Sequence, residues 1–318
     1  MEERAQINNS WQQADRTKLS LLILSIICAG LFSGIVMLNV IFFIIALAAL
    51  ITLTVRFGYN YAALAGLISG MVCFIFYGEM LTLILALMVL IPGYLMGYKS
   101  RIFSPAYSVI FWGMLPFLFP LIILVLYYPE LISQGPLMIT EMKGMIDENA
   151  AVLGLGGSQL KLMYSSIETT VTWAFRLAPG ILFTMSMSIV VFAYLGAMET
   201  SKYFGAILPR FKPLYLWKPS ELLLIPLGIS LLFVLLGGPW FGVIGENALV
   251  FMIHLYAFLG ICLIDFYFKR MRVPTAVRLI VYLLVMVGIV VVIPALAILS
   301  VIDSRFDFRK ISQVENKS

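Results

Sequence analysis

The sequence predicts an all-α integral membrane protein, a polytopic helix bundle with about nine transmembrane helices and a cytoplasmic N-terminus. Of its 318 residues, 62% are hydrophobic and 12% are charged, whereas a soluble domain is roughly half apolar and a quarter charged. The apolar residues form runs of about 18 or more, which is the length of a membrane-spanning helix, and they lack the alternation of a β-barrel. Most of the chain is therefore surrounded by lipid, where a helix satisfies its own backbone hydrogen bonds.

Nine apolar segments can be marked along the chain. The first two are separated only by Asn39 and the small residues before it. A single helix from Leu19 to Val55 would be about 55 Å long, too long for one span, so two short spans are predicted. Eight spans in total is the alternative. The segments cover about 19–36, 39–55, 61–77, 81–98, 107–127, 172–197, 221–237, 247–268 and 277–300.

Most lysines and arginines lie in segments that face the cytoplasm if the N-terminus does, as the positive-inside rule requires. This placement explains the formal net charge of +5 without a nucleic-acid partner. The segment 199–220 is basic and aromatic, a composition typical of a headgroup anchor. With nine spans the tail that holds Arg305 and Arg309 lies outside, against the rule. Either its acidic residues offset this, or one segment is not a span.

The polarity of the chain divides it into five parts. The loop after the fifth segment contains two amphipathic pieces on either side of a glycine run, which is typical of helices that lie along a membrane surface. This loop either covers a cavity or crosses the face of the bundle. The parts are a polar cytoplasmic N-terminus (1–18), a first transmembrane unit (19–127), an extracytoplasmic amphipathic loop (128–171), a second transmembrane unit (172–302) and a polar tail (303–318).

Small residues recur at a spacing of four in the first helices. This spacing puts two glycines on one helix face, where it lets helix backbones approach closely in lipid. The faces serve either packing within the chain or the docking of another membrane subunit. They consist of Gly30 and Gly34 (extended by Ala29 and Ser33), Gly66 and Gly70, and Gly93 and Gly97.

One arginine lies inside an apolar segment. Arg176 is followed by Pro179 and Gly180, and a charge inside a span costs a few kcal/mol unless it snorkels or pairs. A structural role would pair it with Glu168 or Glu246. The functional alternative is an anion-binding or ion-pairing group in an outward-facing cavity.

The hairpin of segments between Glu221 and Lys269 contains further polar residues. On its returning helix, Asn247, His254 and Asp265 fall within about 40° of one another, so we expect one polar stripe that faces the bundle interior. His254, the only histidine, is either a neutral hydrogen-bonded residue or a ligand group. Asp265 can instead form an ion pair with Lys269. The candidate ligand-binding residues are Arg176, Glu246, Asn247, His254 and Asp265.

No motif in the sequence indicates an enzyme. The cysteines Cys28, Cys73 and Cys262 lie inside apolar runs without a CxxC pair, which indicates packing rather than a disulfide or metal site. A single histidine excludes a His-based metal cluster, and no GxSxG or HExxH motif is present. We expect no catalytic residues, no cofactor and no metal.

Two motifs carry a family resemblance. The tail from Asp303 to Lys310, with its Asp-x-x-Phe-Asp-Phe-Arg-Lys pattern, and the Trp-x-Pro sequence from Trp217 to Pro219 resemble the YybS-like family of bacterial multi-pass membrane proteins, which has no assigned function. The segment from Arg56 to Gly66 is similar to the substrate-binding (S) components of energy-coupling-factor transporters and to the rod-shape protein MreD. In S components, a small-x-x-x-small face on the first helix docks a membrane subunit, and Ala29 with Ser33 occupies the matching place. S components usually have six helices, fewer than predicted for this chain.

The resemblance implies a multi-pass protein of the bacterial cytoplasmic (inner) membrane. The main functional hypothesis is a small-solute-binding or transport-related subunit. The alternative is a non-transporting scaffold or interaction partner of an envelope complex. The expected partners are the lipid bilayer, an unknown small-molecule ligand and, in the second case, another membrane subunit.

Overall fold

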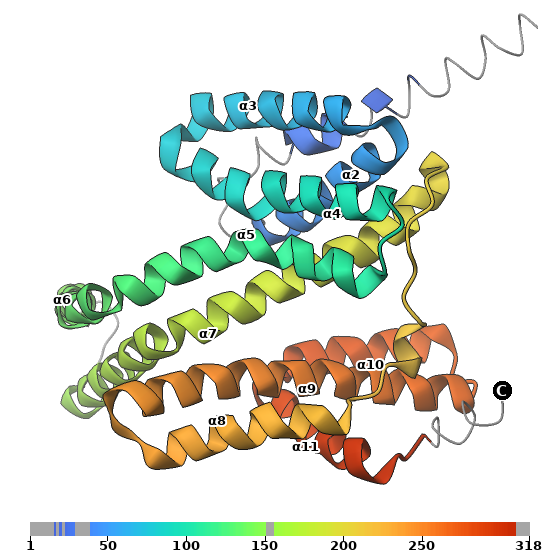
Figure 1. Cartoon of the computed structure of the whole chain (residues 1–318). Coiled ribbons are helices and arrows are strands. Elements are labelled where there is room, and N and C mark those ends of the chain that lie inside the picture. The colour runs from blue at the N-terminus through green and yellow to red at the C-terminus, as the bar shows by residue number, and fades with distance from the viewer. Residues whose placement is uncertain (1–15, 17–18, 21–22, 29–38, 151–155, 310–318) are drawn as a thin grey trace, which may run out of the picture. The chain divides into compact units, whose positions relative to one another are not determined.

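The chain folds into helices joined by short connections (Figure 1). The computed structural model describes residues 16, 19–20, 23–28, 39–150 and 156–309, and no strand occurs among them. In these described parts, six helices are long and apolar enough to cross a membrane, and two shorter apolar helices follow residues 220 and 274. The six overlap the predicted segments 39–55, 61–77, 81–98, 107–127, 172–197 and 247–268, and several extend beyond them. The all-helical, multi-pass class is therefore confirmed.

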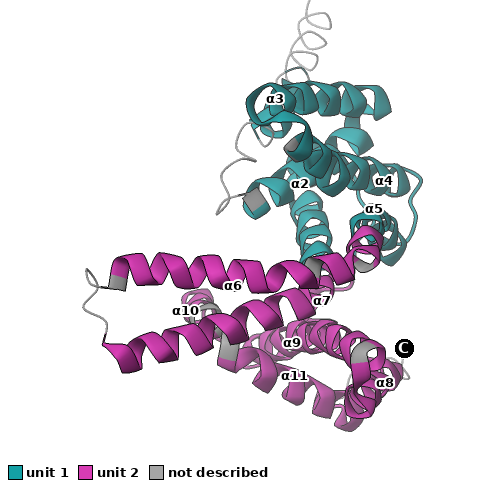
Figure 2. Ribbon diagram, turned by 90° about the vertical axis from the view of Figure 1, so that its left-hand side faces the viewer, with its two compact units in different colours: residues 1–120, 185–211 teal, residues 121–184, 212–318 magenta. Residues whose placement is uncertain are grey.

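The chain forms two compact units (Figure 2). Unit 1 comprises residues 1–120 and 185–211, and unit 2 comprises residues 121–184 and 212–318. Helix α7 (Gly157–Phe204) contributes its first part to unit 2 and its last part to unit 1. These units follow contacts, whereas the five parts expected from the sequence follow polarity.

Unit 1 is built around a buried helix. The core side chains of α2 include Leu47 and Ile51, which are inaccessible to solvent. Gly78 (φ 80°) interrupts the helix that follows α2, and Figure 1 shows that the chain reverses direction between the first part of α3 and α4. This turn separates the two predicted spans 61–77 and 81–98. The elements are α2 (Asn39–Phe57), α3 (Tyr59–Leu85), the π-helical turn η1 (Ala86–Leu90), α4 (Ile91–Arg101) and α5 (Ala106–Leu126).

The glycines of α4 permit a close approach between α4 and α2. A Cβ atom at Gly93 would lie 2.6 Å from a methyl carbon of Leu50, and one at Gly97 would overlap the side chain of Thr54. Backbones that approach this closely gain dispersion contacts along the interface. Gly93 and Gly97 therefore form a packing face inside unit 1.

Unit 2 begins with the last residues of α5 and continues with two antiparallel helices, α6 (Tyr128–Ala150) and the first part of α7. Lys143 of α6 forms an ion pair with Glu168 of α7, and Tyr164 donates a hydrogen bond to Asp147. The second amphipathic piece of the predicted loop is therefore not a separate surface helix. It continues into the sixth span as one helix of 48 residues, about 72 Å long, more than twice the hydrocarbon thickness of a bilayer.

The remainder of unit 2 packs around α9 (Val243–Arg270), which lies against α8 (Leu224–Leu236) and α11 (Ile289–Phe306). The predicted span 277–300 is not one helix, because Gly288 separates α10 from α11. The other elements are η2 (Leu214–Leu216), η3 (Glu221–Leu223), η4 (Gly238–Gly242) and α10 (Thr275–Val287).

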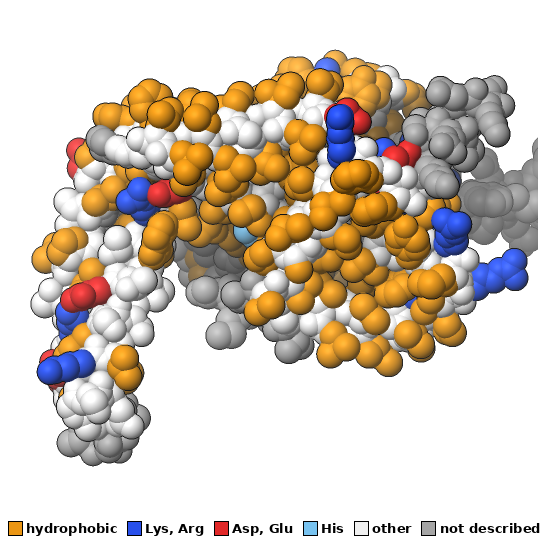
Figure 3. Space-filling view, turned by 90° about the horizontal axis from the view of Figure 1, so that it is seen from below, with side chains coloured by type: hydrophobic (Ala, Val, Ile, Leu, Met, Phe, Trp, Pro, Cys, Tyr) orange, Lys and Arg blue, Asp and Glu red, His pale blue; other side chains and the backbone are white. Residues whose placement is uncertain are grey.

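Hydrophobic side chains are spread over much of the surface drawn in Figure 3, and charged side chains are few on it. Many large apolar side chains are more than half exposed, including Ile75, Leu235 and Val291. Exposed apolar area of this extent marks a membrane-facing surface. The fold therefore supports the membrane class that composition predicted.

Candidate functional site

Arg176 of α7 is paired with Glu246 of α9. Its Nε and one terminal nitrogen donate to the two carboxylate oxygens of Glu246, the second bond at 2.7 Å. The guanidinium also lies 5.7 Å from the ring centre of Trp173. This two-point geometry is the strongest form of an Arg–carboxylate pair, and it neutralises the arginine within unit 2. Of the two structural partners considered for Arg176, the structure selects Glu246.

Asn247, the residue after Glu246, forms hydrogen bonds with two backbone groups of α7. Its Oδ1 accepts from the N–H of Gly180 at 2.6 Å, and its Nδ2 donates to the carbonyl of Arg176 at 3.0 Å. These two groups would bond to each other in a regular helix, but Pro179 lies between them and disturbs the ladder. A Cβ atom at Gly180 would lie 2.6 Å from the carbonyl oxygen of Asn247, so the glycine allows the close contact.

Tyr128 of α6 joins the same cluster, since its hydroxyl donates to the carbonyl of Arg176 at 3.2 Å. Burial raises the pKa of the Tyr128 hydroxyl, which keeps it protonated as a donor. The cluster thus joins α6, α7 and α9, and every polar side chain in it has a partner within unit 2. Its observed contacts are those of an interhelical clamp, while the predicted ligand-binding role of these residues stays a prediction.

His254 does not face the interior of unit 2. The side chain is exposed, and its Nδ1 lies 2.7 Å from the carbonyl of Val250 one turn earlier. Helix α9 buries the opposite face, which carries Tyr256 and Leu263, about 160–200° away from His254. The predicted inward direction of the stripe is therefore wrong at His254.

Asp265, at the far end of the stripe, is paired locally. Its carboxylate lies 3.3 Å from Nζ of Lys269 and accepts from the Tyr282 hydroxyl at 3.1 Å. Arg278 lies at 4.0 Å. The stripe is thus one helix face, with Asn247 against α7, Asp265 against α10, and His254 exposed between them.

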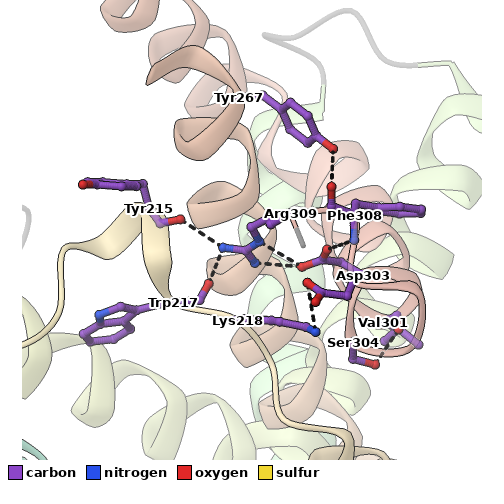
Figure 4. Close-up of polar contacts among 10 residues, drawn as sticks. Tyr215, Trp217, Lys218, Tyr267, Val301, Asp303, Ser304, Phe308 and Arg309 are labelled. Carbon is purple, nitrogen blue, oxygen red and sulfur yellow. Dashed lines mark hydrogen bonds and ion pairs between the residues drawn. The ribbon is translucent and has the colours of Figure 1, made fainter. Parts of the chain in front are cut away.

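A second polar cluster joins the tail to the segment before α8 (Figure 4). Asp303 and Arg309 form a fully buried ion pair, with both side chains at 0% exposure and a shortest contact of 2.9 Å. Arg309 also donates to the carbonyls of Tyr215 at 3.2 Å and Trp217 at 2.5 Å. One guanidinium therefore connects the end of α11 with η2, which is almost a hundred residues away in sequence.

Further contacts support this tail cluster. Asp307, in the left-handed conformation that ends α11, forms an ion pair with Lys218 at 3.1 Å. The backbone N–H of Phe308 donates to Asp303, and the Tyr267 hydroxyl donates to the carbonyl of Phe308. Residues 303–309 therefore lie at the same end of unit 2 as residues 215–218.

Sequence reasoning identified both motifs of the tail cluster but did not bring them together. The pattern that starts at Asp303 and the Trp-x-Pro sequence at Trp217 carried the family resemblance, and the structure shows them in contact. The available signal was an acid and an arginine six residues apart at the end of an apolar segment. A buried charge needs a partner, but the sequence does not show which charges are buried.

Unit 1 contains an open apolar groove of about 780 Å³ between α3, α2 and α4. Gly66 and Gly70 form part of its floor. A Cβ atom at Gly70 would meet nothing within 4 Å. Exposed side chains of α3, such as Met71 and Ile75, line the rim. The third predicted small-residue face (Ala29, Gly30, Ser33 and Gly34) lies outside the described residues.

Comparison with known proteins places the chain in a family. Residues 21–304 match the model of a family described as "Predicted membrane protein (DUF2232)". The chain belongs to this family. No curated protein and no solved structure matches this DUF2232 protein. It is thus a multi-pass membrane protein, and its family carries no assigned activity.

The described part of this DUF2232 protein holds no group of three or more His, Cys, Asp or Glu side chains that could bind a metal ion. Its three cysteines are free thiols, and Cys73 and Cys262 are buried. Among the described residues, two candidates for function are the saturated polar clusters of unit 2 and the open groove of unit 1.

Proposed function

We propose that the protein is a small-solute-binding, transport-related membrane subunit whose ligand is an apolar or amphiphilic molecule held in the groove of unit 1. The observation that carries the proposal is the open space at Gly70. The volume of about 780 Å³ lies in the range of small-molecule sites, about 300–1,000 Å³. Twelve of the fourteen lining residues, all but Thr82 and Tyr94, have no side-chain hydrogen-bonding group, which favours an alkyl chain or ring over a charged solute.

Two further points support a bound molecule over catalysis. The lining of the groove contains no acidic, basic or nucleophilic cluster. The sequence from Arg56 to Gly66, which leads into the groove, is the part that resembles S components of a bacterial inner-membrane transporter. The polar residues Arg176, Glu246 and Asn247 are engaged elsewhere.

The proposal is tested by mass spectrometry of the protein purified in mild detergent, read for bound small molecules. Gly70→Phe places an aromatic ring at the groove, where the Cβ site of residue 70 is open. Gly228→Phe is the matched control, since Gly228 of α8 also lies in an apolar helix with open space around it. We expect a bound apolar molecule in the wild type and the control and its loss in Gly70→Phe. Equal retention in both variants contradicts the proposal.

A scaffold role is the second candidate, favoured by the glycine spacing of Gly66 and Gly70. Such a face accepts a second helix in lipid, and α3 exposes Leu67 and Phe74 beside it. In that case the same purification yields a co-purifying membrane protein that Gly70→Phe removes, and no small molecule.

A further inference from the structure

A small second pocket lies in unit 1 where three helices end. Its volume is about 260 Å³. Arg56 belongs to the last turn of α2 and Arg101 to the last turn of α4, and Gly205 follows the end of α7. The lining residues are Val55, Arg56, Arg101, Phe103, Gly205, Ala206 and Ile207.

The lining of this pocket is basic. Two guanidinium groups line it, and none of its lining residues is acidic. Each of the three helix ends contributes a partial negative charge of about one half, which favours arginine at this position. An arginine presents a planar fork of donors that matches the oxygens of a phosphate.

The backbone around the pocket is shaped to hold these groups. Gly58 (φ 101°) leaves room for Arg101, whose terminal nitrogen would lie 2.9 Å from a Cβ atom there. Gly205 (φ 66°) turns the chain beside Arg56. Phe103, in the pocket wall, adopts a φ of 52°, a conformation that is unfavourable for a bulky residue. Arg101 is further positioned 5.0 Å from the ring centre of Tyr59.

Aromatic side chains place this end of unit 1 at the membrane interface. The Tyr59 ring packs against Tyr94 and Tyr98, and Lys99 lies 4.3 Å from the ring centre of Trp112. Tyrosine, tryptophan and basic residues gather at the level of lipid headgroups. A pocket at this level is reached by headgroups before any soluble anion.

The rim of the pocket is apolar. Phe103 and Ile207 are 67% and 72% exposed, although both line a site whose interior is basic. An anion alone gains nothing from these side chains, whereas a phospholipid places its phosphate on the arginines and its chains on the rim. The volume is below the usual range for metabolite sites and suits a headgroup phosphate.

We propose that Arg56 and Arg101 form a binding site for the phosphate of an anionic phospholipid. Basic pockets between membrane helices on the cytoplasmic side are typical sites of this kind, and the charge pattern of the sequence places Arg56 and Arg101 on that side. The site is separate from the apolar groove and does not depend on the proposed function.

The test is native mass spectrometry of the full-length protein in mild detergent, titrated with phosphatidylglycerol, with phosphatidylcholine, or with inorganic phosphate alone. The variant Arg56→Gln/Arg101→Gln removes both guanidinium groups. The control Arg210→Gln/Arg270→Gln removes two exposed positive charges outside the pocket. Arg101→Lys keeps the charge but loses the fork, and circular dichroism shows whether each variant is folded.

We expect the wild type and the control to bind phosphatidylglycerol preferentially and the double variant to lose about tenfold or more in affinity, as the loss of charge-assisted hydrogen bonds predicts. The affinity of Arg101→Lys for phosphatidylglycerol should lie between those of the wild type and the double variant. The proposal is overturned by an equal loss in the control, by equal binding of phosphatidylcholine, or by inorganic phosphate that binds saturably and displaces the lipid.

Discussion

The two units use their unusual residues in opposite ways. In unit 2, the polar side chains of the Arg176 and Asp303 clusters are bonded to each other or to backbone groups, so these clusters join helices. In unit 1, one glycine pair is filled by α2 and the other, at Gly66 and Gly70, leaves an open groove. Saturated polar groups indicate structure, whereas unfilled space indicates a place for another molecule.

The largest loss of stability is expected from breaking the buried ion pair between Asp303 and Arg309. Asp303→Ala leaves the guanidinium of Arg309 without its carboxylate in a fully buried position, which costs about 3–5 kcal/mol. Thermal unfolding in mild detergent measures the loss. The control is Arg305→Gln, whose pair with Glu221 is 70% and 62% exposed and is worth about 1 kcal/mol or less. Equal stability of the two variants would show that the tail cluster does not hold unit 2 together.

The next largest change in stability distinguishes two residues of the polar stripe, Asn247 and His254. Asn247→Ala removes three hydrogen bonds, including the one that the backbone N–H of Gly180 in α7 donates, a loss of about 1–3 kcal/mol. His254→Ala removes an exposed side chain and should change stability by about 0.5 kcal/mol or less. A His254→Ala variant that folds normally but loses a bound ligand would support the predicted ligand role of His254.

A comparable loss is expected from the filled glycine face of unit 1. Gly97→Ala forces a methyl group into the side chain of Thr54, and overpacking of this kind costs about 1–3 kcal/mol. The unfolding temperature should fall relative to the wild type. An unchanged temperature would mean that α2 and α4 can separate freely, and the contrast between the two glycine pairs would then disappear.

The smallest effect has the opposite sign. Gly70→Ala adds a methyl group in open space, and alanine is favoured over glycine inside a helix by about 0.5–1 kcal/mol. This variant should be slightly more stable than the wild type in the same assay. Destabilisation would show that the groove is filled in the folded protein by part of the chain itself.

Much of the fold follows from the sequence because long apolar runs permit little besides membrane helices. The number of membrane spans, in contrast, does not follow from the sequence. Hydropathy treats residues 277–300 as one segment, but a helix boundary at Gly288 depends on local backbone geometry. The contact of Arg309 with Trp217 brings residues 303–309 next to the last part of the basic segment, which apolar segments alone do not predict.

The candidate sites were harder to predict than the fold. Helical periodicity correctly put Asn247, His254 and Asp265 on one face, but it cannot show which neighbours cover that face. The four-residue spacing of glycines is the same in the Gly66 and Gly93 pairs, and only tertiary contacts distinguish an occupied face from an open one. The Asp303–Arg309 pair was missed because burial, which makes a charge important, is a property of the folded chain.

The most direct test of the account is the amount of apolar ligand that remains bound after purification in mild detergent, compared between Gly70→Phe and Gly228→Phe. The account predicts that Gly228→Phe keeps the ligand at the wild-type ratio and that Gly70→Phe, although folded, loses it. Retention of the ligand by folded Gly70→Phe would contradict the assignment of the groove as the binding site.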